Sequence, residues 1–441
     1  MKKLIILLLL FPTIIAAQTN QQKLFEDYMN AESGLRQFNG VVLVSQKGKT
    51  IYQKAFGLAD MEWNVPNTNQ TKFRIGSVTK QFTASCILQL AEKGKLSLDD
   101  KLSKYISDYP KGDSITIHML LSHTSGIKNY TSIPEFWPKS ALPLSTDSMI
   151  ALFKNKPLDF TPGSQFNYSN SGYFLLGYII EKVSGQKYSE YLLENVIRKA
   201  GLPNTSVDRL DSVLAYRAMG YNKTRSGGWE HAMYISMEGP YSAGAMVSTT
   251  DDLAKWTKAL HSNQIISSAS LQKMTTPNLN NYGYGVGIDS FKTHRRISHN
   301  GGIPGFQTNL TYFPNEDICV VAISNTGYSA DRIAIALSSI AFNLPITIPA
   351  NPKEVKIDPA ILDKYAGKYM TENQIELVKR DNKFYRQTNG APEVELKPLS
   401  QTRFFYADQS DRYIEFETDK SGNVTKAWFF TITDKVELKK L

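Results

Sequence analysis

The sequence contains few of the features that identify proteins dependent on disulfides, metals or nucleotides. Only two of its 441 residues are cysteine. Cys86 and Cys319 each lie in an apolar stretch, so we expect two buried free thiols rather than a disulfide or a nucleophile. The six histidines show no H-E-x-x-H spacing, and no Walker loop or dinucleotide fingerprint is present. The sequence therefore predicts no cofactor and no metal.

A concentrated block of positive charge is also missing. The net charge is +9, but the lysine and arginine residues are dispersed along the chain. Nucleic-acid binding requires basic side chains gathered on one face or along one segment. We therefore expect no nucleic-acid partner.

Long apolar runs are absent except at the start of the chain. Lys2 and Lys3 precede an apolar stretch over residues 4–15, which ends in Ala16 and Ala17. This order is typical of a secretory signal peptide, and the run is short for a transmembrane helix. We expect residues 1–17 to be a signal peptide, the mature protein to be periplasmic or secreted, and no membrane span to remain after cleavage.

The rest of the chain has a globular composition, with 41% hydrophobic and 21% charged residues. Two alternating runs around Lys47-Gly48-Lys49 predict a β-hairpin close to the N-terminus. Helical patterns follow, and strand-like runs return towards residue 320. We expect an α/β fold in which an antiparallel sheet contains strands from both ends. The expected helices lie at about 78–93, 172–184, 188–199, 251–260 and 330–342, and the later strands at about 284–288, 308–313 and 318–324.

The character of the sequence changes after residue 343. Residues 344–358 contain three prolines and no periodicity, which indicates a linker. Short alternating runs separated by turn residues then continue to the C-terminus and predict a small β-barrel. We therefore expect a domain over 18–343, a linker over 344–358 and a barrel over 359–441.

The most informative segment of the first domain is Ser77-Val78-Thr79-Lys80. Ser77 follows a short strand-like run and opens an apolar helical run. Residues three apart on a helix share a face, so Lys80 would lie beside the Ser77 hydroxyl and could activate it as a nucleophile. No G-x-S-x-G surrounds Ser77, which argues against an α/β-hydrolase.

The S-x-x-K spacing alone is weak, because it recurs at Ser125, Ser184 and Ser270. Only Ser77 is followed, in order, by two further polar motifs. These are Tyr168-Ser169-Asn170 and His299-Asn300-Gly301-Gly302.

With these motifs the chain resembles the serine β-lactamase and penicillin-binding protein superfamily. The resemblance is closest to the branch of class C β-lactamases, D-alanyl-D-alanine carboxypeptidases and esterases, in which Y-x-N is the second motif. It covers roughly residues 25–340, and the C-terminal segment resembles the lipocalin-like domains of some of these hydrolases. The supporting text includes M-L-L-S-H-T-S-G at 119–126, P-G-S-Q-F-N-Y-S-N-S-G-Y at 162–173, S-A-G-A-M-V-S-T-T-D-D-L-A at 242–254 and G-G-I-P-G-F at 301–306.

The resemblance implies a β-lactamase-like fold, with a sheet flanked by helices and an all-helical lobe, and an active site between them. It implies that Ser77 is the nucleophile, that Lys80 and Tyr168 handle the proton, and that Asn170 binds substrate and holds Lys80. Which of Lys80 and Tyr168 is the base stays open at this point.

The third motif would lie on the strand that lines the cleft. His299, Asn300 and Gly301 are the expected substrate-binding residues, and the N–H groups of Ser77 and Gly302 the expected oxyanion hole. Many relatives have lysine where this chain has His299. A neutral imidazole attracts a carboxylate less than an ammonium group does.

The function implied by the resemblance is that of an exported serine hydrolase, which acts through an acyl-enzyme on amide or ester substrates. β-Lactamase-like or D-Ala-D-Ala carboxypeptidase-like activity is one form of it. The resemblance thus implies a small-molecule or peptide substrate, with peptidoglycan-derived peptides among the candidates. A carboxylesterase of the same fold and a non-hydrolytic penicillin-binding or sensor protein are the two alternatives.

Overall fold

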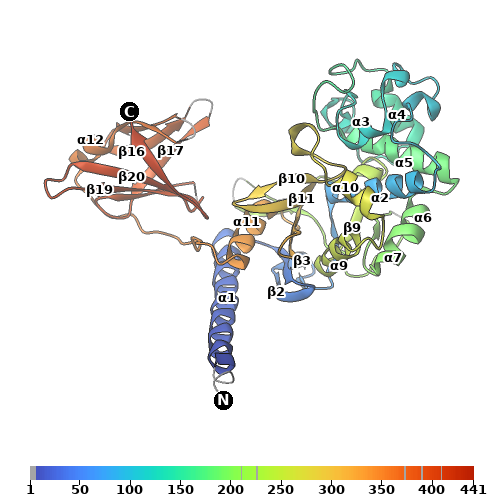
Figure 1. Ribbon diagram of the computed structural model, residues 1–441. Helices are drawn as coiled ribbons and strands as arrows, with labels where there is room; N and C mark the ends of the chain where they lie inside the picture. Colours follow the sequence, from blue (N-terminus) through green and yellow to red (C-terminus); the bar gives the residue numbers. More distant parts are fainter. Residues whose placement is uncertain (1–5, 210, 225–226, 372–373, 389–390, 409) are drawn as a thin grey trace. The chain divides into compact units, whose positions relative to one another are not determined.

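The chain folds into two compact units, shown in the computed structural model of Figure 1. One unit comprises Phe38–Ala334, and the other comprises Met1–Gln37 together with Ile335–Leu441. The structure describes residues 6–209, 211–224, 227–371, 374–388, 391–408 and 410–441.

The unit of residues 38–334 is built on a six-stranded antiparallel sheet with the order β10-β11-β12-β13-β1-β2. Val41 of β1 lies opposite Ile323 of β13, so strands from both ends of the unit are neighbours. This confirms the sheet expected from the sequence. The strands are β1 (Gly40–Gln46), β2 (Lys49–Phe56), β10 (Gly287–Phe291), β11 (His294–Ile303), β12 (Phe306–Phe313) and β13 (Ile318–Ser324).

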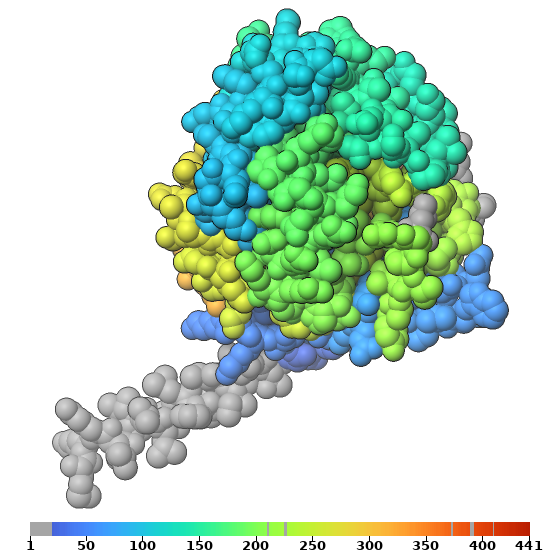
Figure 2. Space-filling view, turned by 90° about the vertical axis from the view of Figure 1, so that its right-hand side faces the viewer, coloured from blue at the N-terminus to red at the C-terminus, as the bar shows by residue number. Residues whose placement is uncertain are grey.

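Helices supply the rest of this unit, and α2 is the most deeply buried of them. Every residue from Thr79 to Leu90 of α2 is buried, because α2 packs on α5, α6 and α8. Helix α9 packs on β1 and β13. Figure 2 shows the face formed by the helical segments. The helices are α2 (Thr79–Glu92), α3 (Ile117–Leu121), α4 (Thr146–Lys154), α5 (Asn170–Ser184), α6 (Tyr188–Leu192), α7 (Arg198–Ala200), α8 (Tyr241–Gly244), α9 (Thr250–His261) and α10 (Ser268–Met274). Helix α11 (Ala330–Ala341) begins in this unit, and its residues from Ile335 on belong to the other unit.

One predicted helix is interrupted. The helix expected over 188–199 is divided into α6 and α7 by a π-helical turn over Leu193–Ile197. The segment ends at Gly201, whose φ of 66° is left-handed and stops the helix. Short strands complete the unit: β3 (Leu58–Asp60), β4 (Val65–Pro66), β5 (Phe73–Arg74), β6 (Ser206–Val207), β7 (Tyr221–Lys223), β8 (Trp229–His231) and β9 (Met246–Ser248).

Both cysteines are free and buried, as the sequence predicts. Burial raises the pKa of each thiol, that of Cys319 to about 12. Each therefore behaves as a small apolar side chain.

The second unit contains a closed barrel of eight antiparallel strands, which follows a short helix, α12 (Leu362–Tyr365). The pairing of β14 with β21 closes the barrel. This confirms the small C-terminal barrel expected from the sequence. The strands are β14 (Gly367–Met370), β15 (Gln374–Arg380), β16 (Lys383–Thr388), β17 (Ala391–Pro398), β18 (Arg403–Tyr406), β19 (Tyr413–Thr418), β20 (Val424–Phe430) and β21 (Lys435–Lys440).

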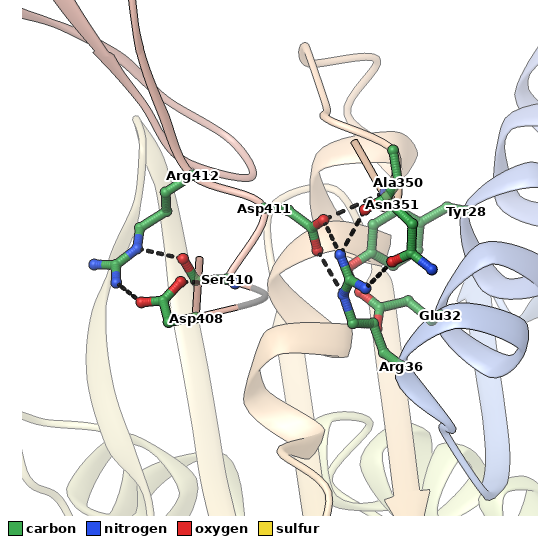
Figure 3. A network of polar contacts seen from close by, with 9 residues as sticks. All are labelled: Tyr28, Glu32, Arg36, Ala350, Asn351, Asp408, Ser410, Asp411 and Arg412. Atoms are coloured by element: carbon green, nitrogen blue, oxygen red, sulfur yellow. Dashed lines mark hydrogen bonds and ion pairs between the residues drawn. The ribbon is translucent and has the colours of Figure 1, made fainter. Parts of the chain in front are cut away.

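The same unit includes the N-terminal helix α1 (Ile6–Arg36). Arg36, in its last turn, forms a buried ion pair with Asp411 and donates to the carbonyl of Ala350 at 2.7 Å (Figure 3). The predicted signal peptide covers the first part of α1, and its residues 1–5 lie outside the described part of the chain. Among the described residues, no helix is both long and apolar enough to cross a bilayer.

Candidate active site

Ser77 lies at the junction between strand β5 and helix α2. A 3₁₀ turn over Gly76–Val78 joins these two elements and runs directly into α2. Gly76 has a φ of 49°, and a Cβ atom on it would lie 2.9 Å from the backbone nitrogen of Gly302. Glycine is therefore needed here for both its conformation and its lack of a side chain. Because Gly76 has no side chain, the turn that carries Ser77 can pack directly against strand β11.

Lys80 lies one turn further along and is fully buried. Its Nζ atom is 3.0 Å from Ser77 Oγ, 2.8 Å from Asn170 Oδ1 and 2.8 Å from the carbonyl oxygen of Ala243. No carboxylate within the described residues forms an ion pair with Lys80. Burial lowers the pKa of Lys80 well below its usual value.

These three contacts suit a neutral amine. The Asn170 and Ala243 oxygens can only accept hydrogen bonds, so they take the two N–H groups of an uncharged amine. The remaining lone pair of Nζ then points at the Ser77 hydroxyl. Lys80 is thereby placed to accept the Ser77 proton.

The Tyr168 ring packs against the amine of Lys80, next to Ser77. Its ring centroid is 4.8 Å from Lys80 Nζ. Its hydroxyl is buried and lies close to that of Ser77. Burial raises the pKa of Tyr168 above its usual value, and a hydrogen bond with Ser77 acts in the opposite direction, so the phenol is protonated at neutral pH. Tyr168 is therefore a neutral phenol whose hydroxyl faces Ser77.

His123 contacts both the ring of Tyr168 and the backbone that follows it. Its Nδ1 atom accepts the backbone N–H of Ser169 at 3.2 Å, and the centroids of the His123 and Tyr168 rings are 4.2 Å apart. Its backbone has a φ of 58°, which is rare for a residue with a side chain. The hydrogen bond from Ser169 ties His123 to the backbone of the Tyr168-Ser169-Asn170 turn.

Asn170, the first residue of α5, is held on both sides. Its backbone N–H donates to Asn129 Oδ1 at 3.1 Å, and its Nδ2 atom donates to Thr131 Oγ1 at 3.4 Å. These contacts fix the orientation of the Asn170 side chain, so that its Oδ1 atom accepts a hydrogen bond from Lys80. The roles of Asn129 and Ala243 have no recognisable sequence signal, because one is a loop side chain and the other acts through its carbonyl.

His299 lies on β11 and is buried. Its Nδ1 atom is 2.6 Å from the Asn300 carbonyl, which can only accept, so Nδ1 carries the proton. Its Nε2 atom therefore accepts the hydroxyl of Tyr282, at 2.8 Å. Burial, with a smaller contribution from Lys80, lowers the pKa of His299 to about 3. His299 is neutral, and neither nitrogen is free for a substrate carboxylate.

The Asn300 side chain is directed away from Ser77. Its Nδ2 atom donates to Asp331 at 2.8 Å, and its Oδ1 atom accepts from Asn309 at the same distance. Neighbouring residues of a strand face opposite sides, which accounts for the different environments of His299 and Asn300. The sequence does not predict this contact with Asp331.

Gly301 and Gly302 allow β11 to approach the nucleophile. A Cβ atom on Gly301 would lie 1.9 Å from the carbonyl oxygen of Ile75 and 3.3 Å from the Ser77 nitrogen. Gly302 lies opposite Gln307, next to the pair of Ile303 and Phe306 that closes the hairpin. Because bonding alternates along an antiparallel pair, its N–H points away from β12 and towards the free edge of β11.

Gly301→Ala is expected to reduce kcat/KM by about a hundredfold, because its methyl group would displace the backbone that carries Ser77. Gly287→Ala is the matched control on the neighbouring strand, since a Cβ atom there would lie 3.5 Å from the nearest atom, the carbonyl oxygen of Ser298. Turnover of a chromogenic ester by both variants, with circular dichroism to check the fold, measures the effect. Equal activities would show that the close approach of β11 to Ser77 is not required.

A small cavity of about 80 Å³ opens next to Ser77. Aromatic and aliphatic side chains form most of its wall, and none of the described residues that line it is charged. In Figure 2 the face of this unit is hollowed between the teal and green helical segments and the yellow-green segments. The side chains that shape the cavity are Tyr130, Thr131, Phe136, Trp137, Ile235, Pro240, Ile303 and Pro304.

Comparisons with known proteins agree with this geometry. The family model described as Beta-lactamase matches residues 22–341. Penicillin-binding protein 4* of Bacillus subtilis is 30% identical over 415 residues, which cover 88% of this chain and 92% of that protein.

Solved structures with the same fold cover most of the chain. The octameric penicillin-binding protein homologue of Pyrococcus abyssi is 26% identical with a TM-score of 0.68, covering 94% of this chain and 98% of that one. The D-amino acid amidase of Ochrobactrum anthropi, at 24% identity and a TM-score of 0.66, covers 74% of this chain and 99% of that one; at this identity the likeness concerns the fold.

Proposed function

Because the chain belongs to the Beta-lactamase family, a family of serine hydrolases and penicillin-binding proteins, we propose that it is an exported serine hydrolase. It forms an acyl-enzyme on Ser77 with amide or ester substrates. The observation that carries this proposal is the buried Lys80, which lies 3.0 Å from the Ser77 hydroxyl and has no carboxylate partner among the described residues.

In the acylation step, neutral Lys80 accepts the Ser77 proton while Oγ attacks the substrate carbonyl. Asn170 and Ala243 hold the amine through its two N–H groups. The N–H groups of Ser77 and Gly302 receive the negative charge that develops on the carbonyl oxygen. Removing one such donor typically reduces the rate by about 10²–10³-fold.

The leaving group then needs a proton. The Tyr168 hydroxyl is protonated, faces Ser77 and has no other partner among the described residues, so it donates to the departing nitrogen or oxygen. Lys80 then passes the proton that it accepted from Ser77 to the Tyr168 oxygen, so that both groups regain their starting protonation states. Water attacks the acyl-enzyme in the second half of the reaction, with the same two groups acting in reverse.

The environment of Ser77 favours substrates without a carboxylate next to the scissile bond. His299 is neutral with both nitrogens engaged, and the cavity beside Ser77 has no charged wall. We therefore assign His299 and Tyr282 to orienting β11 rather than to anchoring an anion. Acyl groups with an apolar side chain, including those of amino acid amides, would contact the aromatic and aliphatic wall of this cavity.

The test is a turnover panel on the mature protein, with p-nitrophenyl acetate, D-phenylalanine amide, a D-Ala-D-Ala peptide and nitrocefin. We expect kcat/KM for the ester and the amide, which have no carboxylate, to exceed that for the two carboxylate-bearing substrates by at least about tenfold, which corresponds to one charge-assisted contact. Faster turnover of the D-Ala-D-Ala peptide or nitrocefin would contradict this substrate class and favour a carboxypeptidase or β-lactamase.

The non-hydrolytic alternative has a different outcome. A penicillin-binding or sensor protein would be labelled persistently by a fluorescent penicillin and would turn over none of the panel. Labelling that disappears within minutes, or turnover of any substrate, excludes it.

A further inference from the structure

A second cavity, of about 220 Å³, lies next to the cavity beside Ser77. Pro304, in the turn between β11 and β12, lines both cavities. Tyr234 lines the second cavity and its neighbour Ile235 lines the first, so a second short segment also borders both. A substrate whose acyl part fills the first cavity can therefore extend into the second.

The backbone that forms the second cavity is held by contacts on several sides. The N–H of Met219 donates to the carbonyl of Ala59 at 2.8 Å, and that of Ala232 donates to the carbonyl of Gly220 at 3.0 Å. Gly220 packs so closely against the turn between β11 and β12 that a Cβ atom on it would lie 2.7 Å from the Phe306 ring. The fold therefore fixes the wall of this cavity, as is usual for ligand sites.

Two arginines in the wall of the second cavity share one carboxylate. The Nε atom of Arg74 donates to Asp208 Oδ2 at 2.7 Å, and Arg217 Nη1 lies 3.2 Å from Asp208 Oδ1. Both arginines line the cavity, whereas the Asp208 side chain is only 2% exposed and does not. Within the described residues, the two Nη groups of Arg74 have no hydrogen-bond partner, and a guanidinium group can only donate. One positive charge and several N–H groups are therefore left for a ligand.

The other charged groups near this cavity do not cancel that charge. His231 is a third residue of the wall that can carry a positive charge, and its Nε2 atom is 2.7 Å from Glu62 Oε1. Glu62 does not line the cavity and its side chain is 59% exposed, so solvent screens its charge. None of the described residues that line the cavity has a carboxylate. The second cavity therefore favours an anion.

Apolar side chains form the rest of the wall. Met233 is 48% exposed and Tyr234 is 50% exposed, which is high for large side chains of this kind. Exposed apolar side chains gathered at a cavity are typical of a binding surface. A free inorganic anion would leave them uncovered, whereas an anion on an aliphatic or aromatic chain would cover them. The apolar residues are Ala218, Met219, Ala232, Met233, Tyr234 and Phe306.

We propose that the second cavity binds a carboxylate at the far end of the acyl part of the substrate, held by Arg74 and Arg217. This inference rests on the proposed function, because it adds a specificity to the reaction at Ser77. The Nη groups of Arg74 donate to the carboxylate oxygens, and Arg217 adds a second charge-assisted contact. The single net charge of the two arginines and Asp208 matches a monoanion.

The position of Arg74 sets the length of the substrate. Arg74 precedes Ser77 by three residues, which span at most roughly 10 Å of backbone. The carboxylate therefore lies several bonds from the scissile bond. The preferred substrate has an anion at the far end of its acyl part and none next to the scissile bond, where His299 is neutral.

Mono-p-nitrophenyl esters of adipic, suberic and sebacic acid test this proposal. Each is compared with the neutral ester in which an amide replaces the free carboxylate. We expect kcat/KM of the wild type to be at least about tenfold higher for the acid than for the amide at one or more of these lengths. Arg217→Gln should abolish this preference and leave turnover of p-nitrophenyl acetate unchanged, whereas Arg217→Lys should keep most of the preference.

Arg296→Gln is the matched control. Arg296 is paired with Asp289 at 2.6 Å, and its side chain is 23% exposed against 29% for Arg217, but it does not line the second cavity. This variant should keep the full preference. Equal kcat/KM for acids and amides at every length would overturn the proposal, and so would a preference that persists in Arg217→Gln or is lost in Arg296→Gln. A lower unfolding temperature of Arg217→Gln with an unchanged preference would identify Arg217 as a purely structural partner of Asp208.

Calorimetry with Ser77→Ala separates this proposal from the proposed function, because that variant keeps the second cavity and lacks the nucleophile. We expect it to bind the best acid ester at least tenfold more tightly than the matching amide, and the added change Arg217→Gln to remove the difference. That result would support the site even if the wild type turned over none of the esters, which would refute the hydrolase alone. Equal affinities for acid and amide would overturn the site, while turnover of p-nitrophenyl acetate by the wild type would still support the hydrolase.

Discussion

Ser77→Ala is expected to abolish turnover and covalent labelling while leaving the fold intact. In the part of the chain that the structure describes, Ser77 is the one serine whose hydroxyl contacts the buried Lys80. Removing the nucleophile of a serine hydrolase typically lowers kcat by about a million-fold. Hydrolysis of p-nitrophenyl acetate and labelling by a fluorophosphonate probe measure the loss, and the unfolding temperature checks the structure.

Two other serines with lysine at the third following position serve as controls. Ser184 Oγ donates to the carbonyl of Ile180 in its own helix, and Ser270 lies in α10, where its N–H is capped by Ser267. Ser184→Ala and Ser270→Ala should therefore keep almost full activity. Undiminished activity or labelling of Ser77→Ala would place the nucleophile elsewhere and refute the proposed function.

Lys80→Ala and Tyr168→Phe are each expected to reduce kcat by several orders of magnitude, and the double variant should be little worse than either. The two groups pass one proton between Ser77 and the leaving group, so losing either interrupts the same path. Effects of residues that act as a unit are strongly non-additive. Single-turnover rates of the four proteins with a chromogenic ester give the comparison, and multiplication of the two losses would argue for separate roles.

Lys80→Arg separates the base role of Lys80 from its contacts. Arginine can still donate to Asn170 and Ala243, but it stays protonated and cannot accept the Ser77 proton. We expect it to be about as inactive as Lys80→Ala. In the wild type, activity should persist at neutral pH and fall as the pH drops through the lowered pKa of Lys80, because the protonated amine has no lone pair. Substantial activity of Lys80→Arg would show that Lys80 acts through its hydrogen bonds alone.

Local sequence patterns determined much of this protein. The alternation of apolar residues in 41–46 and 50–56 and the strand-like runs at 308–313 and 318–324 predict strands. The Ser77 to Lys80 spacing places both side chains on one helix face. The short alternating runs after residue 358 predict the barrel, which the structure confirms. The order of the three polar motifs indicates the family, since each motif is continuous in sequence.

Tertiary structure decided what depends on burial and on contacts between distant segments. The same lysine would be charged on a surface; enclosure of α2 by α5, α6 and α8 gives Lys80 its lowered pKa. Tyr282 occupies a nitrogen of His299, and Asp331 draws Asn300 away from Ser77, neither of which any local pattern reveals. Desolvation and hydrogen-bond partners are properties of the three-dimensional environment, so the sequence specifies them only through the complete fold.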